Sequence, residues 1–287
     1  MIDRYAVIGN PIAHSKSPQI HKMFAVQTGQ NIGYEAILSP LDGFAATVER
    51  LRKEGYKGCN VTVPFKFEAF KLAIQNLTDR AKGAQAVNTL KFEGDSIYGD
   101  NTDGAGLICD IEQNLGIPLQ DKRVLLMGTG GAAWGVAVPL LLSGVATVTV
   151  GYRNESKAKA LLDGVSLADM PLQLSLKEGQ LVSRNYMNLS GGAITPEQQF
   201  DIVINATSSS LSNEMPPLPP GIFASGALAY DMMYGRETPF MKFARQNGAD
   251  VVSDGLGMLI EQAAESFFIW RGVRPRTAPV ISVFRLS

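Results

Sequence analysis

The stretch VLLMGTGGAAWG, residues 124–135, decides the fold of a large part of this chain. An apolar run typical of a buried strand leads into the glycine-rich turn 128–133, and a helical sequence follows. Glycines let the chain turn tightly and let a pyrophosphate approach backbone N–H groups at the start of a helix. Ala133 takes the last position of the G-x-G-x-x-G pattern, where alanine is accepted. We therefore predict a dinucleotide-binding turn, with a plain strand–helix turn as the alternative.

The end of the next predicted strand indicates which dinucleotide binds. An NAD site places an acid about 20 residues after the glycines, where it binds the ribose 2′-hydroxyl. Gly151 and Tyr152 stand at that place, and Arg153 follows. The planar fork of an arginine suits a 2′-phosphate, so the pattern favours NADP.

Two alternatives to this NADP site stay open. Glu155 would serve an NAD site if the register were shifted by a few residues. Arg153 and Lys157 are otherwise ordinary charges of a solvated surface.

Composition and charge exclude several classes of protein. The chain has 287 residues, of which 45% are hydrophobic and 18% charged, so it can bury a core and is not disordered. A formal net charge of −1 gives no reason to expect nucleic-acid or membrane partners. Cys59 and Cys109 lack metal-ligand spacing, and the start MIDRYAVIGN has no apolar signal region, so we expect a cytoplasmic protein.

Short apolar runs alternate with longer amphipathic ones, which predicts βαβ units and a mostly parallel sheet. Proline- and glycine-bearing segments at 183–199 and 212–221 are interpreted as loops. The predicted strands are 5–9, 34–38, 58–63, 124–127, 147–150, 201–205, 227–231 and 249–252, with a hairpin of 88–92 and 96–99; the predicted helices are 18–29, 42–54, 67–74, 104–115 and 258–271.

The pattern predicts an α/β protein of two domains. Residues 105–255 would form a Rossmann-like NADP-binding domain. Residues 1–104 would form a first α/β domain. The closing helix 258–271 has no sheet partner of its own, so we expect residues 256–287 to complete that first domain.

Lys66 stands just past the predicted strand 58–63, and Asp103 lies in the polar cluster YGDNTDGAG, residues 98–106. In an open α/β sheet, a residue beyond the carboxyl end of a strand faces the crevice where ligands bind. Taken singly, Lys66 is equally consistent with a surface lysine and Asp103 with a helix N-cap.

Eight motifs, in this order along nearly the whole chain, resemble the shikimate dehydrogenase family. They are GNPIAHSKSPQIH (9–21), NVTVPFK (60–66), AVNTL (86–90), GDNTDGAG (99–106), GTGGAA (128–133), INATSS (204–209), YDMMYGRETPF (230–240) and DGLGMLIEQAA (254–264). The resemblance implies NADP-dependent, reversible reduction of 3-dehydroshikimate to shikimate, a step of aromatic amino-acid biosynthesis. It also implies that Lys66 and Asp103 are the catalytic pair, without deciding which of the two accepts the proton.

The substrate carboxylate would be held by Ser15 and Ser17, two hydroxyls at the start of a helix, although a serine there can also be an N-cap. The resemblance further implies substrate contacts at Thr62, Asn88, Tyr234 and Gln262. For the cofactor it implies contacts at Asp79, Gly128, Thr129, Gly130, Gly131, Ala132, Ala133, Tyr152, Arg153, Asn154, Lys157, Thr207, Met232 and Gly255.

The sequence departs from the family pattern at Thr129, at Tyr152 and Asn154 beside the phosphate pocket, and at Ser210. The strength of the NADP preference therefore stays open. Two alternatives are a quinate/shikimate dehydrogenase with relaxed use of NAD and NADP, and a non-catalytic NADP-binding sensor. We expect no metal site, read His14 and His21 as structural, and expect a monomer or a homodimer.

Overall fold

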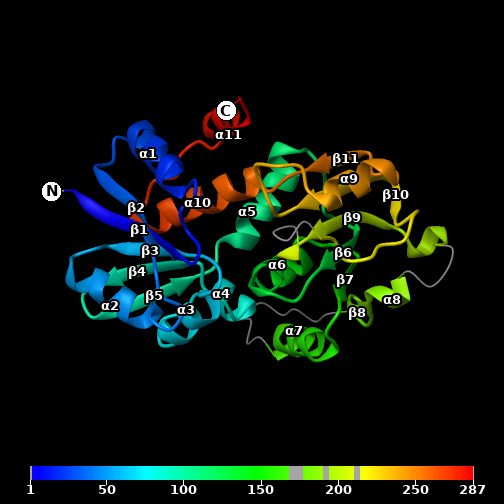
Figure 1. The fold of residues 1–287 in the computed structure, drawn as a ribbon, viewed down its shortest axis with the longest axis horizontal. Helices are drawn as coiled ribbons and strands as arrows, with labels where there is room; N and C mark the ends of the chain where they lie inside the picture. The colour runs from blue at the N-terminus through cyan, green and yellow to red at the C-terminus, as the bar shows by residue number, and fades with distance from the viewer. Residues whose placement is uncertain (1, 168–176, 190–193, 210–213, 287) are drawn as a thin grey trace. The chain divides into compact units, whose positions relative to one another are not determined.

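The computed structural model describes residues 2–167, 177–189, 194–209 and 214–286. The chain forms two compact units, one of residues 1–107 with 259–287 and the other of residues 108–258. Each unit is built on its own sheet (Figure 1). The predicted α/β class, with a Rossmann-like sheet beside a second α/β fold, is confirmed.

The first unit contains a five-stranded mixed sheet. Its strands lie in the order β2 (Ile32–Leu38), β1 (Asp3–Gly9), β3 (Gly58–Val61), β4 (Thr89–Glu93) and β5 (Ser96–Asp100). The first three strands are parallel, and β4 and β5 form the predicted antiparallel hairpin. The helices that connect the strands are α1 (Ser17–Thr28), α2 (Phe44–Lys53), α3 (Lys66–Leu72) and α4 (Asp79–Ala84).

Both faces of this sheet are buried, and side chains alternate between them as a strand requires. On one face, Ile8 of β1 joins a core cluster with Phe44 of α2 and with Phe65. Toward the other face, Tyr5 of the same strand stacks on Trp270, with ring centroids 4.6 Å apart.

Trp270 belongs to α10 (Leu256–Arg271), the closing helix that the sequence predicts. The second half of this helix is tied to the first sheet by hydrogen bonds. Ser266 Oγ accepts a hydrogen bond from Asn60 Nδ2 at 2.9 Å, and Trp270 Nε1 donates to Leu90 O at 3.0 Å. The chain then ends in α11 (Ala278–Leu286), which the sequence analysis did not predict.

The second unit contains a six-stranded parallel sheet. Its strand order is β11 (Val251–Ser253), β10 (Phe223–Asp231), β9 (Phe200–Asn205), β6 (Arg123–Met127), β7 (Thr147–Tyr152) and β8 (Leu181–Asn185). The order reverses between β6 and β9, where open α/β sheets bind ligands at the carboxyl ends of the strands. The helices of this unit include α6 (Gly131–Leu142), α7 (Glu155–Leu167) and α9 (Pro239–Gln246), and α5 (Asp103–Cys109) leads into it through a π-helical turn (Asp110–Asn114).

The interpretation of residues 183–199 as a loop is wrong for its first part. Strand β8 runs through Asn185 and pairs with β7, and the short helix α8 (Tyr186–Leu189) follows directly. The polar residues of β8 fit a strand at the edge of a sheet, where apolar alternation is weak. Residues 214–219, with their prolines, form no helix or strand, as predicted.

Within the described ranges, no helix has the length and apolar character that crossing a membrane requires. The same part of the chain contains no group of three or more His, Cys, Asp or Glu residues placed to hold a metal ion.

His21 of α1 is a buried titratable group in the aromatic core of the first unit. Its ring is fully buried and stacks on Tyr34 with centroids 4.1 Å apart. Burial lowers the pKa of His21 to about 3 from its ordinary 6.5. The unfolded chain therefore binds a proton more readily than the folded one as the pH falls from 6.5 toward 3.

We expect His21→Phe to flatten the acid side of the stability profile. As the pH falls from 6.5 toward 3, the unfolding free energy of the wild type should fall by up to about 1.4 kcal/mol per pH unit more than that of the variant. Urea unfolding of both proteins between pH 7 and pH 4 measures the difference. Parallel profiles would show that His21 is not buried in its neutral form.

Candidate active site

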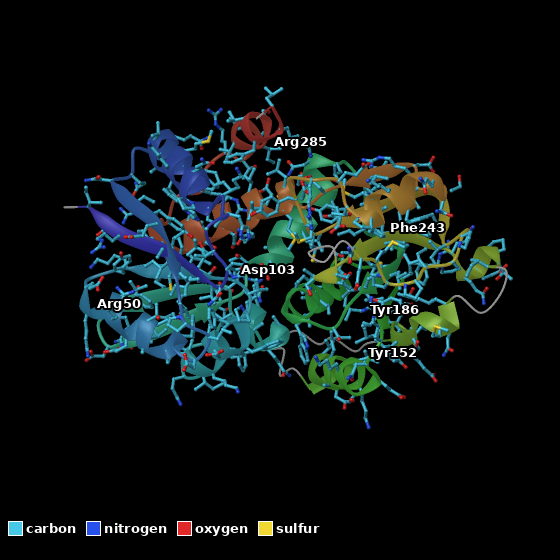
Figure 2. The ribbon with its side chains drawn as sticks, viewed as in Figure 1. Arg50, Asp103, Tyr152, Tyr186, Phe243 and Arg285 are labelled. Atoms are coloured by element: carbon cyan, nitrogen blue, oxygen red, sulfur yellow. The ribbon has the colours of Figure 1, made fainter. Side chains whose placement is uncertain are left out.

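The structure brings Lys66 and Asp103 together. Lys66 Nζ donates a hydrogen bond to Asp103 Oδ2 at 2.5 Å. The two side chains are only 14% and 7% exposed, so the pair is largely withdrawn from water. Figure 2 labels Asp103 at the beginning of α5.

Local backbone structure places both charges. Strand β3 ends at Val61, and after the four residues 62–65 helix α3 begins with Lys66 itself. Asp103 is likewise the first residue of α5, but its carboxylate is engaged by side chains. Neither of the simpler interpretations, a solvated lysine or a carboxylate that only caps a helix, describes this geometry.

Asn88 holds the carboxylate from its other side. Its Nδ2 donates to Asp103 Oδ1 at 2.8 Å, and its Oδ1 accepts hydrogen bonds from Thr102 N and from Thr89 Oγ1, each at 2.9 Å. Gln262 of α10 reaches the same cluster, with its Oε1 3.4 Å from Asn88 Nδ2. Four of the predicted residues, Lys66, Asp103, Asn88 and Gln262, thus form one polar cluster.

The cluster continues through residues that the sequence analysis did not assign. Asn60 Nδ2 lies 3.1 Å from Thr89 Oγ1 and 2.9 Å from Ser266 Oγ, and Thr102 Oγ1 lies 3.3 Å from Ser266 Oγ. All four of these side chains are buried. Asn60 and Thr102 belong to quoted motifs, whereas Ser266 follows the last motif. The only sequence feature that points to Ser266 is its position four residues after Gln262, which places both on the same side of a helix.

Ser15 and Ser17 form a second polar pair of the first unit. Ser15 Oγ accepts a hydrogen bond from Ser17 N at 3.3 Å, and Ser17 is buried at the first position of α1. The hydrogen bond that Ser17 makes with Tyr34 connects the pair to the larger cluster, because Tyr34 Oη donates to Asn60 Oδ1 at 2.7 Å.

Thr62 follows β3 and is fixed by a close backbone approach. Its N–H donates to Ile8 O at 2.9 Å, and a Cβ on Gly9 would lie 2.5 Å from Thr62 Cγ2. Glycine at position 9 therefore gives Thr62 its room. Asp79 lies elsewhere, exposed in the first turn of α4, where its carboxylate is 3.4 Å from Lys82 Nζ.

In the second unit, the glycine turn has the geometry that a pyrophosphate needs. Gly128 has φ +110°, a conformation that favours glycine, and Gly130 is extended with no atom within 4 Å of a Cβ built on it. Helix α6 begins at Gly131, so its first N–H groups, including those of Ala132 and Ala133, point to the end of β6. Thr129 is half-buried within this turn.

Two further segments meet beside that turn. Thr207 packs against Gly128, with Cγ2 3.1 Å from a Cβ built there, and donates through Oγ1 to Asn205 Oδ1 at 2.7 Å. Met232 N donates to Asn205 O at 3.0 Å. A Cβ on Gly255 would lie 2.4 Å from Met232 O, so this position requires glycine. Tyr234 is half-buried two residues beyond Met232.

The predicted phosphate pocket lies at the end of β7. Tyr152 is half-buried, while Arg153 and Lys157 are exposed. Asn154 has a structural task, because its Oδ1 accepts the Lys157 N–H at 3.1 Å and so caps α7. The departure noted at Ser210 lies outside the described residues.

A glycine turn at the switch point of a parallel α/β sheet is typical of dinucleotide-binding proteins. Family models match residues 7–90, as the shikimate dehydrogenase substrate binding domain, and residues 255–283, as the shikimate 5′-dehydrogenase C-terminal domain. The chain is 56% identical over 286 residues to the shikimate dehydrogenase (NADP(+)) of Methylobacillus flagellatus, with 100% of both chains covered. It belongs to the shikimate dehydrogenase family.

Solved structures agree with this assignment. An Ael1 enzyme from Pseudomonas putida is 46% identical with a TM-score of 0.85, covering 98% of this chain and 97% of that one. Shikimate 5-dehydrogenase from Thermus thermophilus, in complex with NADP(H) and shikimate, is 28% identical with a TM-score of 0.82 and 99% of each chain covered.

We expect Gly130→Ala to separate cofactor binding from folding. The open space and extended backbone at Gly130 accept a methyl group, so the melting temperature should not fall. The same methyl group would stand where a pyrophosphate approaches, so NADP⁺ should bind about 5- to 100-fold more weakly, the equivalent of about 1–3 kcal/mol of overpacking.

Calorimetric titration with NADP⁺ and thermal unfolding measure the two effects. Gly255→Ala is the matched comparison, because its Cβ would meet Met232 O and should lower the melting temperature. Unchanged NADP⁺ affinity in Gly130→Ala would place the pyrophosphate elsewhere.

Proposed function

We propose that the chain catalyses the NADP-dependent, reversible reduction of 3-dehydroshikimate to shikimate. The observation that carries the proposal is the buried hydrogen bond between Lys66 and Asp103 in a chain of this family. The cofactor supplies the hydride acceptor, so the protein has to bind and orient an alcohol and move its proton.

The Lys66–Asp103 pair is the group that exchanges the hydroxyl proton. Oxidation of a secondary alcohol removes the hydroxyl proton as the hydride leaves the carbon, and a positioned acid–base group lowers that barrier. Asp103 is held from two sides, by Lys66 Nζ and by Asn88 Nδ2, so its orientation is set before the substrate binds. In the reverse direction the same pair returns the proton to the carbonyl oxygen.

The remaining polar groups of the first unit hold the ring. Ser15 and Ser17 offer hydroxyl donors to the carboxylate beside the first turn of α1, where the helix dipole favours an anion. Thr62, Asn88 and Gln262 surround the ring hydroxyls and the carboxylate. Tyr234, a residue of the second unit, makes a further substrate contact. The network that joins Asn88 to Gln262 keeps these groups in place.

The second unit fits NADP. The N–H groups of the turn 128–133 would hold the pyrophosphate, and Arg153 with Lys157 would hold the 2′-phosphate. Met232 and Gly255 would contact the nicotinamide. The remaining cofactor contacts would come from Thr207, Tyr152, Asn154 and Asp79. We assign residues 1–104 and 256–287 to the substrate-binding catalytic domain and residues 105–255 to the NADP-binding domain. A cytoplasmic location and a monomeric or homodimeric state stay predictions.

The direct test is the formation of NADPH when shikimate and NADP⁺ are added to the purified protein. Steady-state rates with quinate and NAD⁺ under the same conditions distinguish a strict shikimate dehydrogenase from the broader quinate-accepting alternative. Cofactor binding without turnover of any of these substrates would instead support a sensor.

We expect Lys66→Ala to lower kcat by roughly 10²- to 10⁴-fold, the usual contribution of a positioned acid–base group. KM for shikimate should change much less, because the serines and ring-binding groups stay in place. Lys71→Ala, an exposed lysine of the same helix, is the control and should leave both constants unchanged. A normal kcat with a large rise in KM would make Lys66 a binding residue only.

We expect Arg153→Ala to weaken NADP⁺ by about ten- to a hundredfold, because hydrogen bonds to charged groups contribute roughly 1.5–3 kcal/mol. NAD⁺ lacks the phosphate, so its kcat/KM should hardly change. Lys159→Ala, another exposed cation of α7, is the control. If kcat/KM fell equally with both cofactors, Arg153 would support the fold instead, and another cation would bind the 2′-phosphate.

A further inference from the structure

Tyr186 occupies a position beside the glycine turn that none of the family motifs covers. Strands β7 and β8 pair in parallel, with Tyr152 opposite Asn185, and Tyr186 follows at once as the first residue of α8. Its side chain is buried, with 3% of the residue exposed. Figure 2 labels Tyr186, the first residue of α8, and Tyr152, the last residue of β7.

The ring of Tyr186 lies directly against the backbone at the end of β7. A Cβ built on Gly151 would stand 2.7 Å from Tyr186 Cε1 and 3.3 Å from its Cζ. Real Cβ atoms do not approach so closely, so one of the two groups would have to move. The ring is packed in a core cluster with Leu125 and Met127, and a packed side chain yields only at a cost.

The charge of Arg153 also acts on the Tyr186 hydroxyl. Burial raises the pKa of this hydroxyl well above its usual value, while the charge of Arg153 opposes that rise. Gly128 N donates to Gly151 O at 2.9 Å. Tyr186 therefore packs against the end of β7, whose Gly151 is bonded to the glycine turn, and it feels the charge of the proposed phosphate-binding arginine.

Gly151 is one of the two positions at which an NAD site would carry its acid. We propose that Tyr186 is a specificity-determining residue of the NADP site, because its ring fills the space that an acidic side chain on Gly151 would need. The inference rests on the proposed function, since it assumes that the end of β7 receives the adenosine ribose. The site would then discriminate between NADP and NAD in two ways. The Tyr186 ring excludes the acid that an NAD site needs, and Arg153 attracts the 2′-phosphate of NADP.

The test compares Gly151→Asp in the wild type and in a Tyr186→Val background. Dissociation constants for NAD⁺ and NADP⁺ are measured by calorimetry, so the result does not depend on turnover of shikimate. With Tyr186 present, Gly151→Asp should lower the melting temperature and give no gain in NAD⁺ affinity. In the Tyr186→Val background the same change should strengthen NAD⁺ binding by about tenfold, the worth of about 1.4 kcal/mol of hydrogen bonding.

Tyr152→Asp is the matched control. Successive residues of a strand point to opposite faces, so an acid at 152 does not meet the ring of Tyr186. Its effect on NAD⁺ binding should therefore be the same in both backgrounds. An equal effect of Gly151→Asp in both backgrounds, whether a gain or none, would overturn the proposal.

Gly151→Ala provides a second comparison should the aspartate variant not fold. It should lower the melting temperature of the wild type and have a much smaller effect in the Tyr186→Val background. Equal losses in the two backgrounds would show that the ring does not restrict this position and would also overturn the proposal. If the wild type did not oxidise shikimate, the proposed function would be wrong. The dissociation constants for NAD⁺ and NADP⁺ would still test the role of Tyr186, because they do not depend on turnover.

Discussion

The hydrogen bond between Lys66 and Asp103 sets the requirements for much of the first unit. Withdrawing two charges from water is costly unless further hydrogen bonds satisfy them. Asn88 supplies one of these bonds to Asp103, and its own amide is fixed by Thr89 and Thr102. Helix α10 adds Gln262 and Ser266, so this helix is bound to the same polar cluster as strands β3 and β4.

At other proposed binding positions, a close approach between a glycine and a neighbouring residue constrains the structure. Gly9 makes room for Thr62, and Gly255 makes room for Met232. In each pair a glycine from one motif touches a residue of another motif, so the motifs depend on one another in space although they are separated in sequence. Gly151 and Tyr186 make a similar close approach, but both lie outside every motif, and the importance of Tyr186 appears only once β8 is paired with β7.

The sequence allowed the main architecture to be predicted, because the apolar runs of β1, β6 and β9 and the turn at Gly128 are strong local signals. It failed at β8, whose polar residues resemble a loop, and at α11, for which no helix was expected. The pairing of Lys66 with Asp103 depended on a resemblance, since the residues are 37 positions apart. Ser266 could not have been found, because its contact with Asn60 spans 206 positions.

A double-mutant cycle on kcat/KM for shikimate tests most directly whether Lys66 and Asp103 act as one proton-exchanging unit. The four proteins are the wild type, Lys66→Met, Asp103→Asn and the double variant. Residues that act together give strongly non-additive losses, so the double variant should be about as slow as the slower single variant. Losses that multiply in the double variant would contradict the proposal and show that the two side chains contribute independently.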